Sequence, residues 1–362
     1  MSGFKVFSTG KDLDAIFATR TGTDPSAQLV PFVTRAGQNL SERFLKYTSG
    51  TKASATGYKC FDINGNMVDL SELYSKLITW NAMGSGTDGQ VSAIAVLDSS
   101  NVFVGGKFTT PGLNIARWNA NNSTWYPMGS GAGTTAVGVT SIAVLDASNV
   151  FVGGQFITPG NRIARWNANN STWNPVGSGV GEVGLGDYAY AIDILDASNV
   201  FVGGRFTTPG NRIARWDGSN WYQMGSGVGG VAVPAVYAIA VLDASNVFVG
   251  GEFLSAGGTN GKNRIARWDG SNWYPMGSGV GGNVFAIDVL DASNVFVGGE
   301  FITAGGTSGI IGVARWNANN SSWNKMGSGV GSYVYAINVL NANNVFVGGV
   351  FATPGSRIAI WG

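Results

Sequence analysis

The sequence predicts an all-β protein whose main part is a six-bladed β-propeller of four-stranded antiparallel blades. Three observations predict this fold: a sixfold Val-Phe-Val-Gly-Gly repeat, turn-rich tetrads between short apolar runs, and a last copy that lacks one strand. The copies begin at Val102, Val150, Val200, Val247, Val295 and Val345. They lie 47 to 50 residues apart, which is the period of a propeller blade.

The third copy shows the strand pattern of one repeat. Ala189 to Leu195 is a short apolar run that ends at the turn Asp196 to Asn199. The runs Val200 to Phe206, Arg212 to Trp216 and Trp221 to Met224 follow, each separated from the next by glycine-rich or asparagine-rich turns. Four short runs joined by tight turns predict one four-stranded antiparallel sheet per repeat.

The last copy stops after its third run, Ile358 to Trp361, and has no fourth. A fragment near the other end, Ile78 to Gly86, reads as a fourth strand without the first three. The two fragments add up to one repeat. We therefore expect the N-terminal strand around 78–86 to complete the last blade and close the ring, which leaves no open sheet edge. This organisation predicts two parts: an N-terminal arm of residues 1–76 and a propeller of residues 77–362.

Composition narrows the classes of function. Charged residues make up only 12% of the chain and the formal net charge is +1, so we expect no nucleic-acid partner. No apolar run is long enough to cross a membrane, so we expect no membrane insertion. The chain has no histidine, which removes imidazole metal ligands and Ser-His-Asp triads. We therefore expect no metal, no cofactor and no catalytic residues; the protein is predicted not to be an enzyme.

Two side-chain patterns recur in the copies. All 12 tryptophans fall at two positions of the repeat, which predicts packing between blades, with sugar stacking as the alternative. An arginine precedes one of these tryptophans in five copies: Arg117, Arg165, Arg215, Arg267 and Arg315. We expect these arginines to pair with the turn acids Asp98, Asp146, Asp196, Asp243 and Asp291. The last copy has Ile360 and Asn341 instead, so both partners change together. An anion-binding ring is the alternative.

The strings Phe253 to Gly258, Ile265 to Gly270 and Met276 to Val280 carry a family resemblance. This part of the chain resembles the kelch-like propellers of the fungal cortical polarity marker family and related surface proteins. Kelch-type propellers include galactose-oxidase-like enzymes, whose copper site uses histidine and a Cys-linked tyrosine. Without histidine, and with its one cysteine (Cys60) outside the repeats, this chain cannot build that copper site.

The first 76 residues contain three short modules, each predicted to be a strand, a turn and an N-capped helical turn. The predicted strands are Phe4 to Val6, Phe32 to Thr34 and Tyr58 to Cys60, and helical turns follow near residues 10–17, 37–44 and 69–74. Both an arm that orders on a partner and an independent domain fit this pattern. The modules loosely resemble structural proteins of large DNA viruses and phages, and that resemblance implies an anchor to a larger assembly.

Differences between the copies locate the candidate binding face. Connections between the second and third strands, and between successive blades, vary in length and are expected to emerge on the same face. The charged residues expected there are Arg162, Arg212, Arg264, Arg357, Glu182, Asp187 and Lys262. Asp193 and Asp288 lie in first strands, where other copies have alanine or asparagine. Because first strands line the channel of a propeller, these two acids are candidates for a cation or polar ligand, with solvation by channel water as the alternative.

The leading hypothesis is a non-catalytic binding or structural propeller, associated with a virion and held to capsid proteins by residues 1–76. The alternative is a secreted or cell-surface carbohydrate-binding propeller, with a glycan as its partner. A glycan hydrolase that depends on carboxylates comes third.

Overall fold

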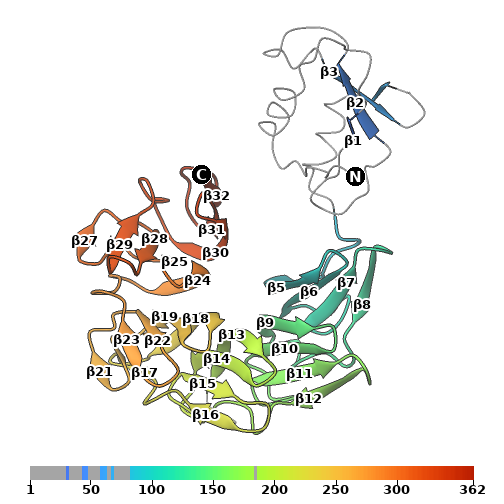
Figure 1. Ribbon diagram of the computed structural model, residues 1–362. Helices are drawn as coiled ribbons and strands as arrows, with labels where there is room; N and C mark the ends of the chain where they lie inside the picture. The colour runs from blue at the N-terminus through green and yellow to red at the C-terminus, as the bar shows by residue number, and fades with distance from the viewer. Residues whose placement is uncertain (1–29, 32–42, 48–57, 63–66, 69–81, 183–185) are drawn as a thin grey trace. The chain divides into compact units, whose positions relative to one another are not determined.

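The computed structural model describes residues 82–182 and 186–362, together with four short strands earlier in the chain (Figure 1). The chain divides into two compact units, residues 1–83 and 84–362. Every regular element among the described residues is a β-strand, so the all-β prediction is confirmed there. The predicted boundary between residues 76 and 77 stays a prediction, because residues 69–81 lie outside the described part.

The first unit contains one antiparallel sheet in the order β1-β2-β3-β4. Its strands are β1 (Val30–Pro31), β2 (Arg43–Tyr47), β3 (Tyr58–Asp62) and β4 (Met67–Val68). The predicted strand Tyr58 to Cys60 is part of β3. Arg43 and Phe44, predicted at the end of a helical turn, lie instead in β2 and pair with Asp62 and Phe61. The other predicted strands and helical turns of this part lie outside the described residues.

The second unit is a series of antiparallel meanders, one per sequence repeat, here called blades 1 to 6. Blade 1 contains β5 (Gln90–Asp98), β6 (Asn101–Lys107), β7 (Ile115–Asn119) and β8 (Thr124–Pro127). Blade 2 contains β9 (Val139–Asp146), β10 (Asn149–Gly154), β11 (Ile163–Asn167) and β12 (Thr172–Pro175). Blade 3 contains β13 (Tyr188–Asp196), β14 (Asn199–Arg205), β15 (Ile213–Trp216) and β16 (Trp221–Gln223).

Blades 4 to 6 continue the series, and the loops of blades 4 and 5 and the connection into blade 4 carry small extra strands. Blade 4 contains β18 (Ala235–Asp243), β19 (Asn246–Glu252), β22 (Ile265–Trp268) and β23 (Trp273–Pro275). Blade 5 contains β24 (Val284–Asp291), β25 (Asn294–Gly299), β28 (Val313–Asn317) and β29 (Ser322–Lys325). Blade 6 contains β30 (Val334–Asn341), β31 (Asn344–Gly349) and β32 (Ile358–Trp361). The loop strands are β17 (Val228–Gly229), β20 (Ser255–Ala256), β21 (Thr259–Asn260), β26 (Thr303–Ala304) and β27 (Thr307–Ser308).

The core lies between consecutive blades. In blade 3, Val200, Phe201 and Val202 are all buried although successive side chains of a strand point to opposite faces. Both faces of the second strand must therefore be covered, one by the preceding blade and one by the following blade. Phe201 belongs to a buried cluster with Val236 and Val249 of blade 4, and Phe248 of blade 4 belongs to one with Val284 of blade 5.

The Gly-Gly pair of the repeat is required by this close approach. A Cβ on Gly250 would lie 2.5 Å from the Val284 side chain of the next blade, and a Cβ on Gly251 would lie 2.1 Å from the Ala235 carbonyl oxygen. The same relation holds between Gly203 of blade 3 and Val236 of blade 4, at 2.3 Å. The strands can approach this closely only where no side chain intervenes.

The two tryptophan positions pack between blades, as predicted. Within a blade the two rings contact each other, as in Trp268 and Trp273 at 5.2 Å between centroids. The indole Nε1 of Trp273 donates a hydrogen bond to the Met224 carbonyl oxygen of the preceding blade, 2.8 Å away. Trp173, Trp221 and Trp323 make the equivalent bonds to Met128, Val176 and Met276. The Met-Gly-Ser-Gly turn of one blade therefore caps the tryptophan pair of the next.

In blades 3, 4 and 5 the arginine before the tryptophan does not bind the turn acid directly, and an asparagine lies between them. Arg215 Nη1 donates to Asn199 Oδ1 at 2.7 Å, and Asn199 Nδ2 donates to both Asp196 carboxylate oxygens at 3.0 Å. Arg267 and Asn246 repeat this arrangement in blade 4. The direct Arg–Asp pairs predicted from the sequence are replaced here because Asp196 also accepts the Ser198 N–H and is committed to its turn.

Blade 6 and blade 1 each leave an apolar surface exposed. Ile358, Ile360 and Trp361 of blade 6 are 60%, 55% and 42% exposed, whereas Ile213 and Ile265 in the third strands of blades 3 and 4 are fully buried. Ile94 and Val96 of blade 1 are 64% and 63% exposed. Gly84 and Ser85, predicted to be part of a strand, lie in a turn. Residues 78–81 lie outside the described part, so ring closure is not established.

Candidate functional site

The two kinds of variable connection meet on one face of the second unit. Connections that enter a blade donate backbone hydrogen bonds to the loop between the second and third strands of that blade. Gly133 bonds to Thr158 at 2.8 Å, Gly181 to Thr208 at 2.6 Å and Gly281 to Thr303 at 2.9 Å. This common surface, built from the inter-blade connections and the loops between second and third strands, is here called the loop face.

In each loop between second and third strands, the residue just before the third strand has left-handed backbone. Arg162, Arg212, Arg264 and Arg357 have φ angles of 62°, 66°, 63° and 67°. The N–H of each donates to a phenylalanine carbonyl, as Arg162 does to Phe156 at 2.8 Å. The shared position explains why four of the seven predicted binding-face residues are arginines: they occupy one structural position of the repeat.

Arg162 is only 2% exposed and organises a loop. Its Nε donates to the Asp187 carbonyl oxygen at 3.2 Å, and its Nη2 donates to the Glu182 carbonyl oxygen at 2.9 Å. The Asp187 carboxylate accepts the Glu182 N–H at 2.9 Å and is 9% exposed. Arg162 and Asp187 therefore hold the connection between blades 2 and 3, and Glu182 is the exposed member of the three.

The remaining predicted residues differ in exposure. Arg212 is partly buried, its Nε donates to the Pro234 carbonyl oxygen at 3.3 Å, and burial lowers its pKa. The Arg264 Nε is buried without a hydrogen-bond partner among the described residues. Lys262 is 7% exposed and fills the place taken in blade 5 by Ile310, while Arg357 is exposed. The structure thus distributes these charges over the blades and does not gather them into one pocket.

Asp193 and Asp288 each bind the backbone of the following blade. Asp193 Oδ2 accepts the Val241 N–H of blade 4 at 2.7 Å, and its Oδ1 accepts the Ile194 N–H at 2.8 Å. Asp288 makes the same bonds to Val339 and Val289. No group of three metal-ligating carboxylate or thiol side chains occurs among the described residues. These contacts assign a blade-joining role to both acids.

Burial raises the pKa of Asp193 to about 6, against the opposing effect of its two backbone hydrogen bonds. Burial also raises the pKa of Asp288. In the unfolded chain an aspartate ionises near pH 4. From this group alone, stability is therefore greatest below pH 4 and falls as the pH rises to about 6.

This pH dependence can be tested with Asp193→Asn. The wild-type protein should lose about 3 kcal/mol of unfolding free energy through this group between pH 4 and pH 7. The neutral amide does not titrate, so the variant is expected to show a flatter profile. Its overall stability is expected to be lower, because one amide oxygen replaces the two carboxylate oxygens that accept the Val241 and Ile194 N–H groups. Urea unfolding at pH 4, 5, 6 and 7 measures the unfolding free energy of both proteins. Parallel profiles for the two proteins would contradict the assignment.

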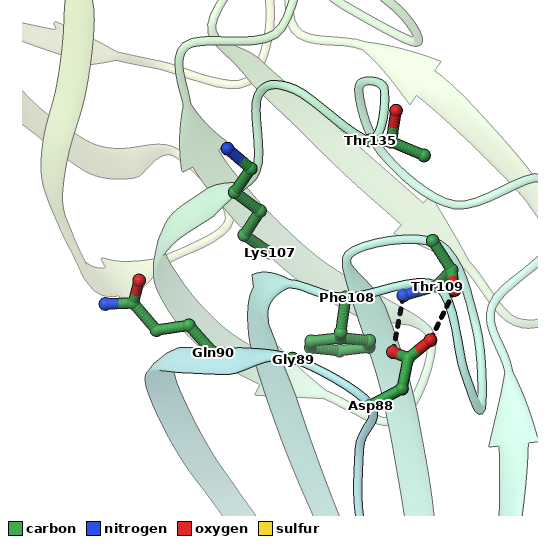
Figure 2. Close-up of a pocket in the computed structure, with 7 residues that line it drawn as sticks. All are labelled: Asp88, Gly89, Gln90, Lys107, Phe108, Thr109 and Thr135. Carbon is green, nitrogen blue, oxygen red and sulfur yellow. Dashed lines mark hydrogen bonds between the residues drawn. The ribbon is translucent and has the colours of Figure 1, made fainter.

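A pocket of about 370 Å³ opens beside the first strand of blade 1 (Figure 2). Its wall includes Asp88, Gln90, Lys107 and Thr135. Asp88 points to Thr109 and accepts hydrogen bonds from the Thr109 hydroxyl and from the Thr109 and Thr110 N–H groups, which lower its pKa to about 2. Asp88 is therefore ionised at neutral pH, and the pocket lining carries one negative and one positive side chain, Asp88 and Lys107.

The sequence analysis missed a row of aromatic rings at the beginning of the first strands of blades 3 to 6. Tyr190, Tyr237, Phe285 and Tyr335 occupy the same strand position and contact one another in that order. The signal was present in the repeat: this position is aromatic in four copies and Ser92 or Thr140 in the other two.

A family model described as the Rax2 C-terminal beta propeller domain matches residues 67–232, somewhat less than half of the chain. No curated protein matches the sequence significantly. The match, the antiparallel four-stranded sheets and the structural neighbours below agree on the architecture. The chain has a β-propeller fold.

The solved structures similar to this propeller have little sequence in common with it. One is the extracellular domain of a protein from B. thetaiotaomicron described as a hybrid two-component system, with a TM-score of 0.54 and 10% identity over 88% of this chain. A second domain of the same description and organism has a TM-score of 0.50 and 10% identity over 88% of this chain. This chain spans 36% and 38% of those two proteins. At such identity the likeness bears on the fold alone.

The described residues form no helix that is long and apolar enough to cross a membrane.

Exposed tyrosines of the fourth strands lie under the arginines of the repeat, with the Arg215 guanidinium 5.4 Å from the Tyr222 ring centroid. These outer pairs recur in blades 1, 3 and 4, as expected of scaffold contacts.

Proposed function

We propose that the protein is a non-catalytic binding propeller that acts at the cell surface or outside the cell. One observation carries the proposal: repeated side chains are used in contacts between blades, while the copies differ mainly on the loop face and at the adjoining strand ends. A rigid scaffold with one variable face is how propellers and other repeat proteins present binding sites.

The proposed location, at the cell surface or outside the cell, is supported by the structural neighbours. Two structures with the same fold are extracellular domains, which favours the predicted alternative of a secreted or cell-surface propeller. The virion setting and capsid partners predicted from the sequence find no support in the comparisons. An anchoring role for residues 1–76 toward a protein partner remains compatible with a surface location. Asp193 and Asp288, the carboxylates of the predicted hydrolase, are accounted for by backbone hydrogen bonds, which supports a non-catalytic role.

We also propose that the ring closes through residues 78–86. Gly84 lies against Trp118 and Trp125 of blade 1, as Gly129 lies against Trp166 and Trp173 of blade 2. Gly84 thus takes the place of the glycine in a preceding blade's turn. We expect the residues before it to form the fourth strand that blade 6 lacks, and that strand would cover Ile358 and Ile360. Closure would bury the apolar surfaces of blades 1 and 6 against each other.

One experiment, in cells that make the protein, can test both its proposed location outside the cell and the proposed binding through the loop face. We expect the native protein to be labelled on intact cells by a membrane-impermeant biotin reagent, and the purified full chain to bind those cells. Replacing residues 254–263 by the five residues 207–211 of blade 3 should abolish binding. The exchange fits the scaffold because both loops begin after a buried phenylalanine and end at an arginine whose N–H bonds to it, at 2.8 Å for Arg264 and 2.9 Å for Arg212.

The matched control shortens a hairpin on the opposite face. Residues 167–172 between Trp166 and Trp173 are replaced by residues 217–220, which join the equivalent pair Trp216 and Trp221. This variant should bind as the wild type does. Protection of the native protein from biotin on intact cells, or equal loss of binding in both variants, would refute the proposal.

A further inference from the structure

Six aromatic side chains form a continuous strip across blades 3 to 6, here called the aromatic strip. Its members are Tyr188, Tyr190, Tyr237, Phe285, Tyr335 and Tyr333. The centroid distances along this order are 5.1, 5.5, 5.6, 5.3 and 6.5 Å. The rings come from the beginnings of β13, β18, β24 and β30 or from the residue just before them. Successive first strands lie side by side, so the strip runs across the blades.

The scaffold does not require these aromatic rings. Blades 1 and 2 have Ser92 and Thr140 at the position of Tyr190, Tyr237, Phe285 and Tyr335. The Thr140 hydroxyl donates to the Ala189 carbonyl oxygen at 2.6 Å, so a small polar side chain fits the same strand position. The tryptophan pairs, in contrast, are present in each of blades 1 to 5 because they join the blades. Because these aromatic residues occur in only four blades, they do not serve the packing that all blades share. Their presence points to another role.

The strip is accessible to a ligand. Tyr190, Tyr237 and Phe285 are partly exposed although a first strand of another blade lies on each side of theirs. The first strands begin where the inter-blade connections end, so the strip adjoins the loop face. An aromatic surface of this kind that remains in contact with water marks a binding site more often than an isolated exposed ring does.

Polar groups of both charges border the strip. Tyr237 donates its hydroxyl to Glu252 Oε2 at 3.2 Å, and Asn283 Nδ2 donates to Glu300 Oε1 at 2.7 Å. Arg205 lies opposite Tyr188 in the β13–β14 pair. Burial and the nearby Glu252 raise the pKa of Tyr237 to about 12, which keeps its hydroxyl protonated as a donor. One cation and two anions around neutral rings do not select a strongly charged ligand.

We propose that the aromatic strip binds a neutral glycan chain lying across blades 3 to 6. The apolar C–H faces of sugar rings pack on aromatic rings, and their hydroxyls exchange hydrogen bonds with tyrosine, carboxylate and guanidinium groups. A strip of several rings fits several linked sugars better than a single sugar. This inference rests on the proposed binding function and supplies its ligand class and site.

The test measures binding of cellohexaose, laminarihexaose, xylohexaose and maltohexaose to the full chain by isothermal titration. We expect at least one of these probes to bind. Tyr335→Ser and Tyr237→Thr, which install the residue types of blades 1 and 2, should each weaken that binding about tenfold. Tyr222→Ser is the matched control, because Tyr222 is 45% exposed on a fourth strand away from the strip. Thermal unfolding confirms that each variant is folded.

The possible results separate this inference from the function on which it rests. If a hexaose binds the wild type and both strip variants equally, the strip is not the site, although the binding function stands. If no hexaose binds but a lysine-rich peptide binds in a manner lost in Tyr335→Ser, the glycan class is wrong. If the protein binds intact cells and every strip variant retains that binding, the inference fails while the proposed function survives.

Discussion

Replacing Trp273 by alanine is expected to lower the free energy of unfolding by about 3–5 kcal/mol. The ring is 8% exposed and packs on Trp268 of its own blade, 5.2 Å away between centroids. Its Nε1 also bonds to the Met224 carbonyl oxygen of blade 3 at 2.8 Å. Alanine removes the ring from an interface between two blades and leaves the Met224 carbonyl oxygen with the Gly227 N–H, 3.1 Å away, as its remaining donor. Urea unfolding followed by far-UV circular dichroism measures the loss.

Two further variants separate the contributions of Trp273. Trp273→Phe keeps a ring but not the hydrogen bond, so we expect a smaller loss of about 1–3 kcal/mol. Tyr274→Ala changes the neighbouring, 42% exposed side chain and should cost less than about 1 kcal/mol. If Trp273→Ala is no more harmful than Tyr274→Ala, the inter-blade role of the tryptophans is wrong.

Gly250→Ala is expected to destabilise the protein by about 1–3 kcal/mol through overpacking. The added Cβ would lie 2.5 Å from Val284 Cγ1 and 2.9 Å from Ile287 Cδ1 of the next blade. The Val284 Cβ would also lie only 2.9 Å away, and Val284 is fully buried, so its side chain cannot avoid the added methyl group without displacing its strand. The measurement is again the urea midpoint and slope, which together report the unfolding free energy.

Gly348→Ala uses the same position in blade 6 to test ring closure. Its added Cβ would meet nothing nearer than the Ala336 Cβ at 3.8 Å, because no following blade covers it. If the ring closes as proposed, Val91 of blade 1, now 39% exposed, takes the place that Val284 has beside Gly250. We then expect Gly348→Ala to be as harmful as Gly250→Ala. A wild-type unfolding free energy for Gly348→Ala, alongside a destabilised Gly250→Ala, would show that the ring stays open.

Local patterns in the sequence were sufficient for the strands of the blades. The Val-Phe-Val runs are apolar on both faces because two blades enclose them, and the turn tetrads end each strand at the predicted place. Paired tryptophans at fixed positions predicted contacts between blades because such large rings must be buried somewhere. These features recur in each repeat, so the sequence alone is sufficient to recognise them.

The candidate site was less predictable, because the charge of a side chain does not determine whether it is buried or which groups it contacts. Arg162 was expected on the surface but is buried, since the connection between blades 2 and 3 wraps around its guanidinium. Asp193 was a candidate for a cation or polar ligand, with channel water as the alternative, but it accepts the Val241 N–H of the next blade. The Arg215–Asp196 pair was expected to be direct, yet Asn199 links the two. Each outcome depends on a carbonyl, N–H or amide group supplied by a distant part of the chain.

The sequence by itself determined the all-β class, the repeat, the strand order within a blade and the burial of the tryptophans. Those properties follow from side-chain periodicity and turn chemistry, which act over a few residues. Only the tertiary structure decided which charged side chains hold loops and which remain exposed, and that Tyr190, Tyr237, Phe285 and Tyr335 form one surface. These residues are about 48 residues apart along the chain, and only the side-by-side packing of successive first strands brings them together.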